Sequence, residues 1–416
     1  MSTLLSTVSR KIKPDSTPEV SECVPPSADL PIQVTGLIEG LIEEAHKLGA
    51  SDVHIDPREE NVRVRVRVDG VLKDLKTYPK RIHCEIISRI KVMAALRIDE
   101  RRLAQDGRFR HLLSDGTFVD VRTSTAPTYH GENAVMRLLA DHSDDFTLDM
   151  LGFNASDQKK IAAAIARPNG MILVTGPTGS GKTTTLYTLI KMLNSAEISI
   201  VTIEDPIEYA IEDIKQMQVH AKNGLTFAAG LRSILRQDPD VIMVGEIRDT
   251  ETAGVAINTS LTGHLLLSTL HTNDAATTLP RLSDMGIDPY LVASTINLVI
   301  GQRLVRTICT KCRVKTTVTP AMAKTLSAIP LRKPILKGEK LWRGKGCEAC
   351  NGTGYRGRTC VNEVLVASTK IQDAIMRKAS ASELTALAVS EGMTTMLEDA
   401  FKKVRSGETT VEEVLR

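Results

Sequence analysis

The chain has 416 residues, of which 42% are hydrophobic, 25% charged and 3% aromatic, and its formal net charge is +3 at pH 7. A chain of this length predicts two or three domains rather than a single core. So few aromatic residues argue against a surface that stacks nucleic-acid bases, and the nearly balanced charge gives no bulk attraction to DNA or anionic lipid. Because the sequence has neither an apolar run of roughly 20 residues nor the apolar core of a signal peptide, we expect a cytosolic protein.

The first part of the chain divides into a tail and a small domain. Residues 1–30 are rich in Ser, Thr and Pro, and we expect them to form a flexible tail. Residues 31–143 are predicted to form an α+β domain, because the apolar spacing from Ile38 to Leu48 is helical and NVRVRVRV, at 61–68, alternates as a strand does. The arginines on one face of this strand could bind phosphate, although a solvated face or a subunit contact is the simpler interpretation.

In residues 144–305, helical segments alternate with short apolar runs. The runs are MILVTG, ISIVTIED, DVIMVGE and HLLLSTLHT. A parallel sheet covered on both faces requires such runs, so an α/β core is predicted. Two cysteine pairs follow within 306–362, and the pattern over 363–416 is helical. The predicted fold class is therefore α/β, with a smaller α+β N-terminal domain, a cysteine module inserted after the core and a C-terminal helical region.

A complete phosphate-binding motif, GxxxxGK[ST], begins at Gly176 and ends at Thr183. The strand MILVT leads into it, and the residues after it have helical character. Its glycines let backbone N–H groups converge, and the helix N-terminus adds partial positive charge. Lys182 can then reach the β- and γ-phosphates of ATP, and the Thr183 hydroxyl can ligate Mg²⁺. The residues predicted to bind the nucleotide are Gly176, Pro177, Thr178, Gly179, Ser180, Gly181, Lys182, Thr183 and Thr184.

Acidic residues stand at the ends of two further apolar strands, one at Glu204 and the other at Glu246. Ligands of open α/β sheets bind at the carboxyl ends of the strands, so both residues should face the nucleotide. One carboxylate can hold Mg²⁺ through water while the other orients the attacking water. A fourth strand brings His271 to the same edge, where it could hydrogen-bond the γ-phosphate or have a structural role.

Two C-x-x-C pairs, in a chain with seven cysteines, predict a metal site. Each pair turns two thiolates toward one point, and four thiolates suit tetrahedral Zn²⁺. A thioredoxin-like dithiol is the alternative, but the βαβ setting of that motif is missing from the sequence. We expect a structural zinc ion, because four cysteines leave no open position. The ligands would be Cys309, Cys312, Cys347 and Cys350.

The order and spacing of these motifs resemble those of the secretion ATPases that serve type II secretion, type IV pili and DNA uptake. GPTGSGKTTT is similar to the Walker A motif of that family, VTIEDPIEY to its aspartate box, LRQDPDVIMVGEIRD to its Walker B motif and TGHLLLSTLHTNDA to its histidine box. In the first domain, ASDVHIDP, RVDG, QDGRF and VDVRTST also match. The resemblance runs from about Gly49 to the C-terminus and implies a RecA-like P-loop ATPase core.

The resemblance also implies roles for single residues of the core. Glu204 would be the general base that polarises water, and Glu246 would hold Mg²⁺ through water. His264 and His271 would couple the state of the nucleotide to the domain interface.

Arginine residues in both domains receive roles from the same resemblance. Arg108 and Arg122, in the first domain, match the family's arginine fingers, which reach a nucleotide bound to a packed second domain. From the sequence alone, both could equally be surface residues. Arg232 and Arg236 precede the Walker B motif, and either a contact with phosphate or a structural salt bridge suits them.

Members of the family work as homohexamers, so the resemblance implies an ATP-hydrolysing ring that uses Mg²⁺ and carries zinc. It would lie in the cytoplasm, peripherally bound to the inner membrane, with a membrane platform protein and a cytoplasmic docking protein as partners. Assembly and export motors usually carry the four cysteines, so we expect a motor for pilus assembly or type II secretion. The alternatives are a pilus retraction motor, a P-loop protein that translocates or binds nucleic acid, and an ATP-binding scaffold that hydrolyses little. No nucleic-acid partner is expected.

Overall fold

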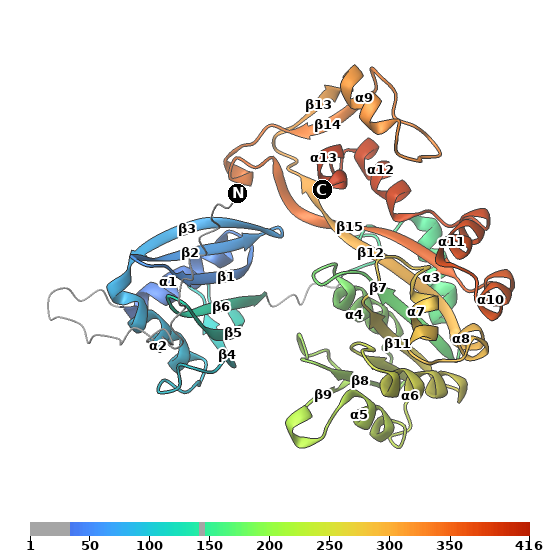
Figure 1. Cartoon of the computed structure of the whole chain (residues 1–416), viewed down its shortest axis with the longest axis horizontal. Coiled ribbons are helices and arrows are strands. Elements are labelled where there is room, and N and C mark those ends of the chain that lie inside the picture. The colour runs from blue at the N-terminus through green and yellow to red at the C-terminus, as the bar shows by residue number, and fades with distance from the viewer. Residues whose placement is uncertain (1–33, 141–145) are drawn as a thin grey trace, which may run out of the picture. The chain divides into compact units, whose positions relative to one another are not determined.

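The computed structural model describes residues 34–140 and 146–416, whose elements are shown in Figure 1. The chain divides into two units, Met1–Asp141 and His142–Arg416. Each unit has a hydrophobic core of its own, so the two are described separately. The predicted tail, residues 1–30, lies outside the described residues.

An antiparallel sheet of six strands forms the centre of the first unit, in the order β3-β2-β1-β6-β5-β4. Its strands are β1 (Ala50–Pro57), β2 (Asn61–Val68), β3 (Val71–Pro79), β4 (Gln105–Leu112), β5 (Phe118–Thr128) and β6 (Gly131–Ala140). Two helices, α1 (Val34–Lys47) and α2 (His83–Met93), share a core with the sheet, and the 3-10 turn η1 (Lys80–Ile82) leads into α2. The predicted α+β domain is confirmed.

Strand β2 contains the alternating segment NVRVRVRV. Its inward valines are fully buried in the core with the helices: Val62, Val64 and Val66. Its arginines form ion pairs with acidic residues of neighbouring strands: Arg63 with Asp74, Arg65 with Asp56 and Arg67 with Asp52. Because these guanidinium groups already form ion pairs within the sheet, the structure favours a solvated strand face over a phosphate site.

A seven-stranded sheet forms the centre of the second unit, in the order β15-β12-β7-β11-β10-β8-β9. All neighbours in it are parallel except β15, which is antiparallel to β12. The strands are β7 (Gly170–Thr175), β8 (Ile200–Glu204), β9 (Lys215–Gln218), β10 (Val241–Val244), β11 (Leu265–Leu270), β12 (Ile296–Ile308) and β15 (Tyr355–Val366). The four predicted apolar runs form β7, β8, β10 and β11.

Helices cover both faces of this sheet, as the continuous apolar strands predict. One core contains side chains of α3 and α4, and the other contains side chains of α5 to α8 together with α10 and α11. The helices of the sheet layers are α3 (Ala155–Ile165), α4 (Lys182–Leu193), α5 (Phe227–Ile234), α6 (Thr250–Leu261), α7 (Thr278–Asp284) and α8 (Pro289–Thr295), with the 3-10 turn η2 (Ala221–Asn223). The predicted α/β core is therefore confirmed.

Strands β12 and β15 extend beyond the other strands of the sheet. Strand β12 pairs with β7 as far as Gly301, opposite Thr175, and beyond that point it pairs with β15 to Ile308, opposite Tyr355. The two strands thus leave the sheet edge as a two-stranded ribbon. The predicted domain limits at 305 and 362 fall inside β12 and β15, because the hydrogen bonds of the ribbon continue across both positions.

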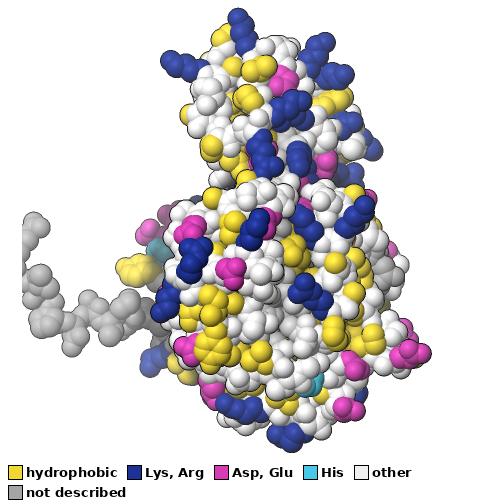
Figure 2. All heavy atoms as spheres, turned by 90° about the vertical axis from the view of Figure 1, so that its right-hand side faces the viewer, with side chains coloured by type: hydrophobic (Ala, Val, Ile, Leu, Met, Phe, Trp, Pro, Cys, Tyr) yellow, Lys and Arg dark blue, Asp and Glu magenta, His cyan; other side chains and the backbone are white. Residues whose placement is uncertain are grey.

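The cysteine module lies at the far end of this ribbon (Figure 1). It contains β13 (Arg313–Thr317), α9 (Pro320–Leu326), β14 (Lys340–Gly344) and the 3-10 turn η3 (Glu348–Cys350), and β13 pairs with β14. Lys and Arg side chains gather on the upper part of the surface in Figure 2, which this module forms. The module therefore gives a basic surface to a chain whose total charge is only +3.

The chain after β15 is helical, as predicted. Its helices are α10 (Thr369–Met376), α11 (Ala381–Ser390), α12 (Met396–Ser406) and α13 (Val411–Leu415). Helix α12 packs on β15, while α10 and α11 join the core of the sheet. Within 34–140 and 146–416, no helix is long and apolar enough to cross a membrane.

Candidate functional site

The phosphate-binding motif forms the turn between β7 and α4. Three of its glycines have positive φ: 146° at Gly176, 76° at Gly179 and 86° at Gly181, which is the N-cap of α4. A Cβ atom on Gly176 would lie 2.3 Å from the carbonyl oxygen of Gln302, so this position requires glycine for close packing as well as for its backbone angle. The loop thus leads directly to a helix N-terminus, which attracts anions.

The Lys182 side chain folds back over this turn. Its Nζ donates to the carbonyl oxygens of Gly176 and Pro177, at 2.9 and 3.2 Å. Burial lowers the pKa of Lys182, and the negative charge of Glu246 partly offsets that effect. The buried Ser180 Oγ has no hydrogen-bond partner in the described part of the chain. A buried ammonium and an unsatisfied hydroxyl in one loop fit the oxygen atoms of a phosphate chain.

Strands β7, β8, β10 and β11 are parallel, so their carboxyl ends lie at one edge of the sheet. A hydrogen-bond network joins two of these ends, because Thr175 Oγ1 lies 3.0 Å from the carbonyl oxygens of both Leu270 and Thr272. The phosphate loop and the segment after β11 are therefore fixed to each other.

Glu246 lies just beyond β10 and contacts two neighbouring side chains. Its Oε2 accepts a hydrogen bond of 3.0 Å from Nε2 of His271, and its Oε1 pairs with the Arg248 guanidinium. Burial raises the pKa of Glu246, but Arg248 and His271 outweigh it and hold the pKa below its ordinary value. The structure thus brings Glu246 and His271 together as an ionised carboxylate and its donor, within the electrostatic reach of Lys182.

Glu204 has a different environment, although it ends the neighbouring strand. Its side chain is 2% exposed and accepts hydrogen bonds from the Tyr187 hydroxyl, from Thr202 Oγ1 at 2.6 Å and from Gln216 Nε2 at 3.1 Å. Burial raises its pKa above the ordinary value despite these three donors. None of the three belongs to the Lys182–Glu246 group, so Glu204 is held in a separate buried network.

The structure also shows where the four arginines proposed from the sequence lie. Arg108 on β4 and Arg122 on β5 are direct cross-strand partners in the first unit. In the second unit, Arg232 forms an ion pair of 2.8 Å with Glu251, and Arg236 donates to the carbonyl oxygen of Arg232. The structure therefore favours the structural interpretation of Arg232 and Arg236.

The two histidines of the predicted histidine box lie at opposite ends of β11. His271 follows the strand and reaches Glu246, whereas His264 precedes it and contacts the carbonyl oxygen of Thr259 at 3.3 Å. Since β11 spans Leu265–Leu270, the two histidines are separated by about 23 Å of extended chain. Of the two, only His271 lies at the edge of the phosphate loop.

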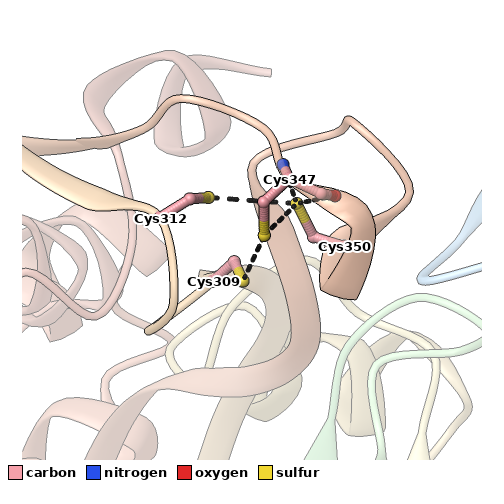
Figure 3. Close-up of side chains that lie close together, drawn as sticks. All are labelled: Cys309, Cys312, Cys347 and Cys350. Carbon is pink, nitrogen blue, oxygen red and sulfur yellow. Dashed lines mark hydrogen bonds between the residues drawn. The ribbon is translucent and has the colours of Figure 1, made fainter.

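The four predicted zinc ligands meet at the base of the cysteine module (Figure 3). Their Sγ atoms all lie within 4.8 Å of one another, with separations of 3.9 Å for Cys309–Cys347, 3.9 Å for Cys312–Cys350 and 3.7 Å for Cys347–Cys350. Four sulfurs at about 2.3 Å from a tetrahedral Zn²⁺ would lie about 3.8 Å apart. The sulfur geometry therefore fits a zinc ion.

Backbone groups support this cluster. The amides of Cys347 and Gly354 both donate to Sγ of Cys350 at 3.2 Å. Burial acts to raise the pKa of Cys350, but these bonds help to lower it to about 6. N–H donors that stabilise a thiolate are the outer-shell support that a sulfur-ligated metal requires.

Three contacts of this site were not predicted from the sequence: Tyr187, Gln216 and Gln302. The first two hold Glu204, and Gln302 contacts the phosphate loop from β12. The only local signal is that Tyr187 lies one turn after the motif, since Gln216 and Gln302 come from distant strands. Arg248 was part of the Walker B segment, but no role was assigned to it.

Comparisons with known proteins show which proteins this chain is similar to. The family model described as type II/IV secretion system protein matches residues 29–416. The type II secretion system protein E of Xanthomonas campestris is 48% identical over 383 residues, covering 92% of this chain and 67% of that protein. The type IV pilus assembly ATPase PilB of Thermus thermophilus is 46% identical over 379 residues, covering 91% of this chain and 42% of that protein. The chain thus spans less than half the length of the Thermus relative.

Two solved structures share the fold. The pilus retraction motor PilT with bound ADP has a TM-score of 0.63 and 27% identity, covering 91% of this chain and 96% of that one. The ATPase DotB of Legionella pneumophila has a TM-score of 0.68 at 22% identity, covering 92% of this chain and 95% of that one, and it supports the fold alone.

Proposed function

Because the chain belongs to the type II/IV secretion system protein family, we propose that it is an Mg²⁺-dependent ATPase that drives type IV pilus assembly or type II protein secretion. The observation that carries this proposal is the edge of the parallel sheet, where the phosphate loop with the buried Lys182 follows β7 and Glu246, hydrogen-bonded to His271, follows β10. Similarity to assembly and secretion proteins at 46% and 48% identity supports the biological process.

The residues of the loop have separate tasks in this proposal. Lys182 would exchange its two carbonyl partners for the β- and γ-phosphates, and Thr183 would supply its hydroxyl to Mg²⁺. The ion neutralises charge on the phosphates when bound. Glu246, whose lowered pKa keeps it ionised, would help to hold the ion, while His271 fixes the orientation of that carboxylate.

Glu204 is proposed as the general base, and its buried network sets its basicity. A carboxylate with a raised pKa is a better proton acceptor near neutral pH than an ordinary one. The network also restrains the side chain, so Glu204 must exchange a hydrogen bond with Tyr187, Thr202 or Gln216 for one with water. The restraint would limit hydrolysis until water reaches Glu204, and the raised pKa would then favour the transfer of a proton to it.

Changing Tyr187 tests this role of Glu204. The Tyr187 hydrogen bond lowers the pKa of Glu204, so Tyr187→Phe should raise that pKa further. We expect the acidic limb of the pH profile of kcat to move to higher pH, because the carboxylate must be ionised to accept a proton. Tyr290→Phe, on the exposed side of α8, is the control. An unchanged acidic limb in Tyr187→Phe would remove Glu204 from the role of base.

The finer proposal is a homohexameric ring at the cytoplasmic face of the inner membrane, bound to a platform protein and a cytoplasmic docking protein. Arg108 and Arg122 would reach the nucleotide of a packed second domain, and a cation supplied there is worth orders of magnitude in rate. If the cations arrive only on domain closure, hydrolysis is tied to movement. Support comes from the pairing of the two arginines across β4 and β5 and from the family membership.

A retraction motor is the second candidate, because the PilT structure shares the fold. The four-cysteine cluster and the similarity to assembly and secretion proteins favour assembly or export. A nucleic-acid translocase is disfavoured because the arginine row of β2 is engaged in ion pairs.

A chromosomal Glu246→Gln substitution distinguishes these processes. The variant should keep its fold and assembly, since Gln has nearly the same size as Glu, but lose hydrolysis. Loss of surface pili with normal protein secretion would assign an assembly motor, and the reverse result would assign a secretion motor. Excess pili would favour retraction and contradict the proposal. An Asp373→Asn chromosome, which changes an exposed acidic residue of α10 outside the nucleotide edge, is the control.

A further inference from the structure

The ribbon of β12 and β15 connects the two candidate sites of the second unit. One end contains Gln302, which lies beside the phosphate loop, and β12 ends directly before Cys309. Strand β15 begins shortly after Cys350 and runs back to the sheet. Cys309 lies seven positions after Gln302, which in an extended strand corresponds to about 23 Å. The metal cluster is therefore joined to the phosphate loop by two hydrogen-bonded strands.

Gln302 makes the contact with the phosphate loop. Its side chain is fully buried, and its Nε2 donates to the carbonyl oxygen of Ser180 at 2.7 Å. Its Oε1 accepts from Thr185 Oγ1 on the first turn of α4 at 2.8 Å. The amide group therefore binds both sides of the turn that contains Lys182, and any movement of this turn must move or break the contact.

The opposite strand holds the segment after β11 in the same way. Glu363, which faces Gly301 across the ribbon, is 5% exposed. Its two carboxylate oxygens accept from the backbone amides of Ala275 at 2.7 Å and Met396 at 3.1 Å. The ribbon thus contacts both loops of the nucleotide edge and also the start of α12.

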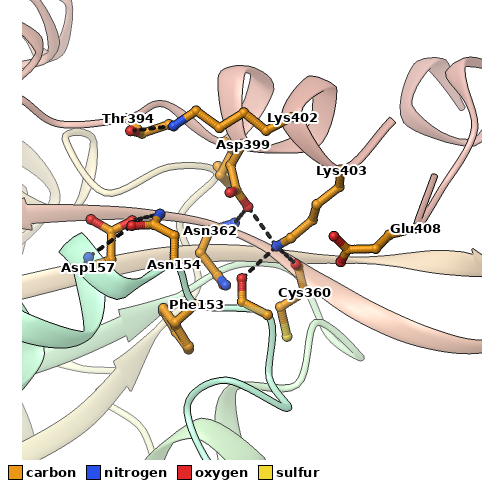
Figure 4. Close-up of polar contacts among 12 residues, drawn as sticks. Phe153, Asn154, Asp157, Cys360, Asn362, Thr394, Asp399, Lys402, Lys403 and Glu408 are labelled. Atoms are coloured by element: carbon orange, nitrogen blue, oxygen red, sulfur yellow. Dashed lines mark hydrogen bonds and ion pairs between the residues drawn. The ribbon is translucent and has the colours of Figure 1, made fainter. Parts of the chain in front are cut away.

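Buried polar contacts stiffen the ribbon from the side of the C-terminal helices (Figure 4). The Lys403 ammonium, on α12, donates to the carbonyl oxygens of Cys360 and Gly152 and pairs with Asp399 at 2.8 Å. Closer to the cysteines, Arg306 on β12 forms an ion pair of 2.7 Å with Glu413. These contacts restrain the ribbon on both sides of the sheet edge, including at Arg306, where its register shifts.

We propose that Gln302 is a positioning residue that couples the phosphate loop to the zinc cluster through the ribbon, so that zinc binding and nucleotide binding strengthen each other. Coupling between two sites is reciprocal in free energy: if zinc tightens nucleotide binding, the nucleotide tightens zinc binding by the same factor. In this proposal the phosphate loop has two states. Gln302 fixes the loop when the metal holds the end of the ribbon, and the loop is looser when that end is free. This inference rests on the proposed nucleotide site.

A four-way comparison of nucleotide affinity tests the coupling. The dissociation constant of fluorescent ADP is measured for the full chain and for Gln302→Met, each with zinc and after treatment with a zinc chelator that leaves Mg²⁺ free. Methionine keeps the size of the side chain but removes the amide. We expect zinc removal to weaken ADP binding at least about fivefold in the unmodified chain and by much less in Gln302→Met. As the reciprocal readout, ADP should slow zinc transfer to a chromogenic chelator.

Each result has one meaning. Equal ADP affinity with and without zinc in the unmodified chain would overturn the coupling, and so would an equal effect of zinc in both chains. If Gln302→Met only weakens ADP binding by the same factor in both zinc states, Gln302 has a structural role alone and the proposal is wrong. Failure of the unmodified zinc-bound chain to bind ADP would instead contradict the proposed function. Arg303→Ala, at the adjacent exposed position of β12, is the matched control and should keep the full effect of zinc.

Discussion

Replacing Lys182 with alanine should reduce the affinity for ATP by about 100-fold or more. The ammonium is buried beside the phosphate loop, and no other described lysine donates to the carbonyl oxygens of Gly176 and Pro177. Two charge-assisted hydrogen bonds to phosphate contribute at least about 1.5 kcal/mol each, and about 1.4 kcal/mol corresponds to a factor of ten. Isothermal titration with a non-hydrolysable ATP analogue measures the change.

The control for this experiment is Lys159→Ala, which removes an exposed lysine of α3 in the same unit. Its affinity should equal that of the unmodified chain, and both variants should keep the circular dichroism spectrum. If Lys182→Ala binds the analogue as tightly as Lys159→Ala does, the Gly176–Thr183 turn is not the phosphate site.

Replacing Cys347 with serine should remove the metal and destabilise the cysteine module. The thiolate is one of four within 4.8 Å, and serine is a poor ligand for Zn²⁺. Structural zinc contributes on the order of 10 kcal/mol of apparent binding free energy, which is lost with the metal. Metal analysis should give about one zinc per unmodified chain and none in the variant. Limited proteolysis should cut the variant selectively between β12 and β15.

Cys360→Ala separates this effect from the general loss of a cysteine. Cys360 is buried on β15, outside the four-cysteine cluster, and burial raises the pKa of its thiol to about 11. This variant should retain its zinc. Equal zinc content in Cys347→Ser and in the unmodified chain would show that the cluster is not the metal site.

Local patterns predicted the parts of the fold that local forces determine. Strands β7, β8, β10 and β11 could be predicted because each is a short run of apolar or small residues, interrupted only by Glu204 at the end of β8. The phosphate loop was recognised because its glycines and Lys182 stand at fixed spacing between a strand and a helix. In β2, the alternation of valine and arginine predicted which side chains are buried and which lie on the other face of the strand.

Contacts between distant segments could not be read from the same patterns. Strand β15 carries Arg, Thr, Asn and Glu and pairs with β12 across the whole cysteine module, so neither composition nor spacing indicated a core strand. The partners of Glu204 come from α4 and β9 as well as from its own strand. The sequence could place this carboxylate at the end of β8, but its burial and raised pKa depend on Tyr187 and Gln216.

The different environments of the two carboxylates agree with different tasks. Glu246 has its pKa lowered by Arg248 and His271, which keeps it ionised as a metal-holding group requires. Glu204 has its pKa raised by burial, which suits a proton acceptor. A pair of acidic groups whose surroundings shift their pKa values in opposite directions is the arrangement that divides acid–base work in enzymes.

The most direct test of the proposed motor is phosphate release from Mg·ATP by the purified chain and by Glu246→Gln, measured side by side with ATP binding. The account predicts turnover by the unmodified chain, and ATP binding with a rate lower by about 100-fold or more in Glu246→Gln, because removing one preorganised charge at a reaction centre has an effect of this size. Equal rates in the two proteins, or tight ATP binding without turnover by the assembled, zinc-bound chain, would contradict it.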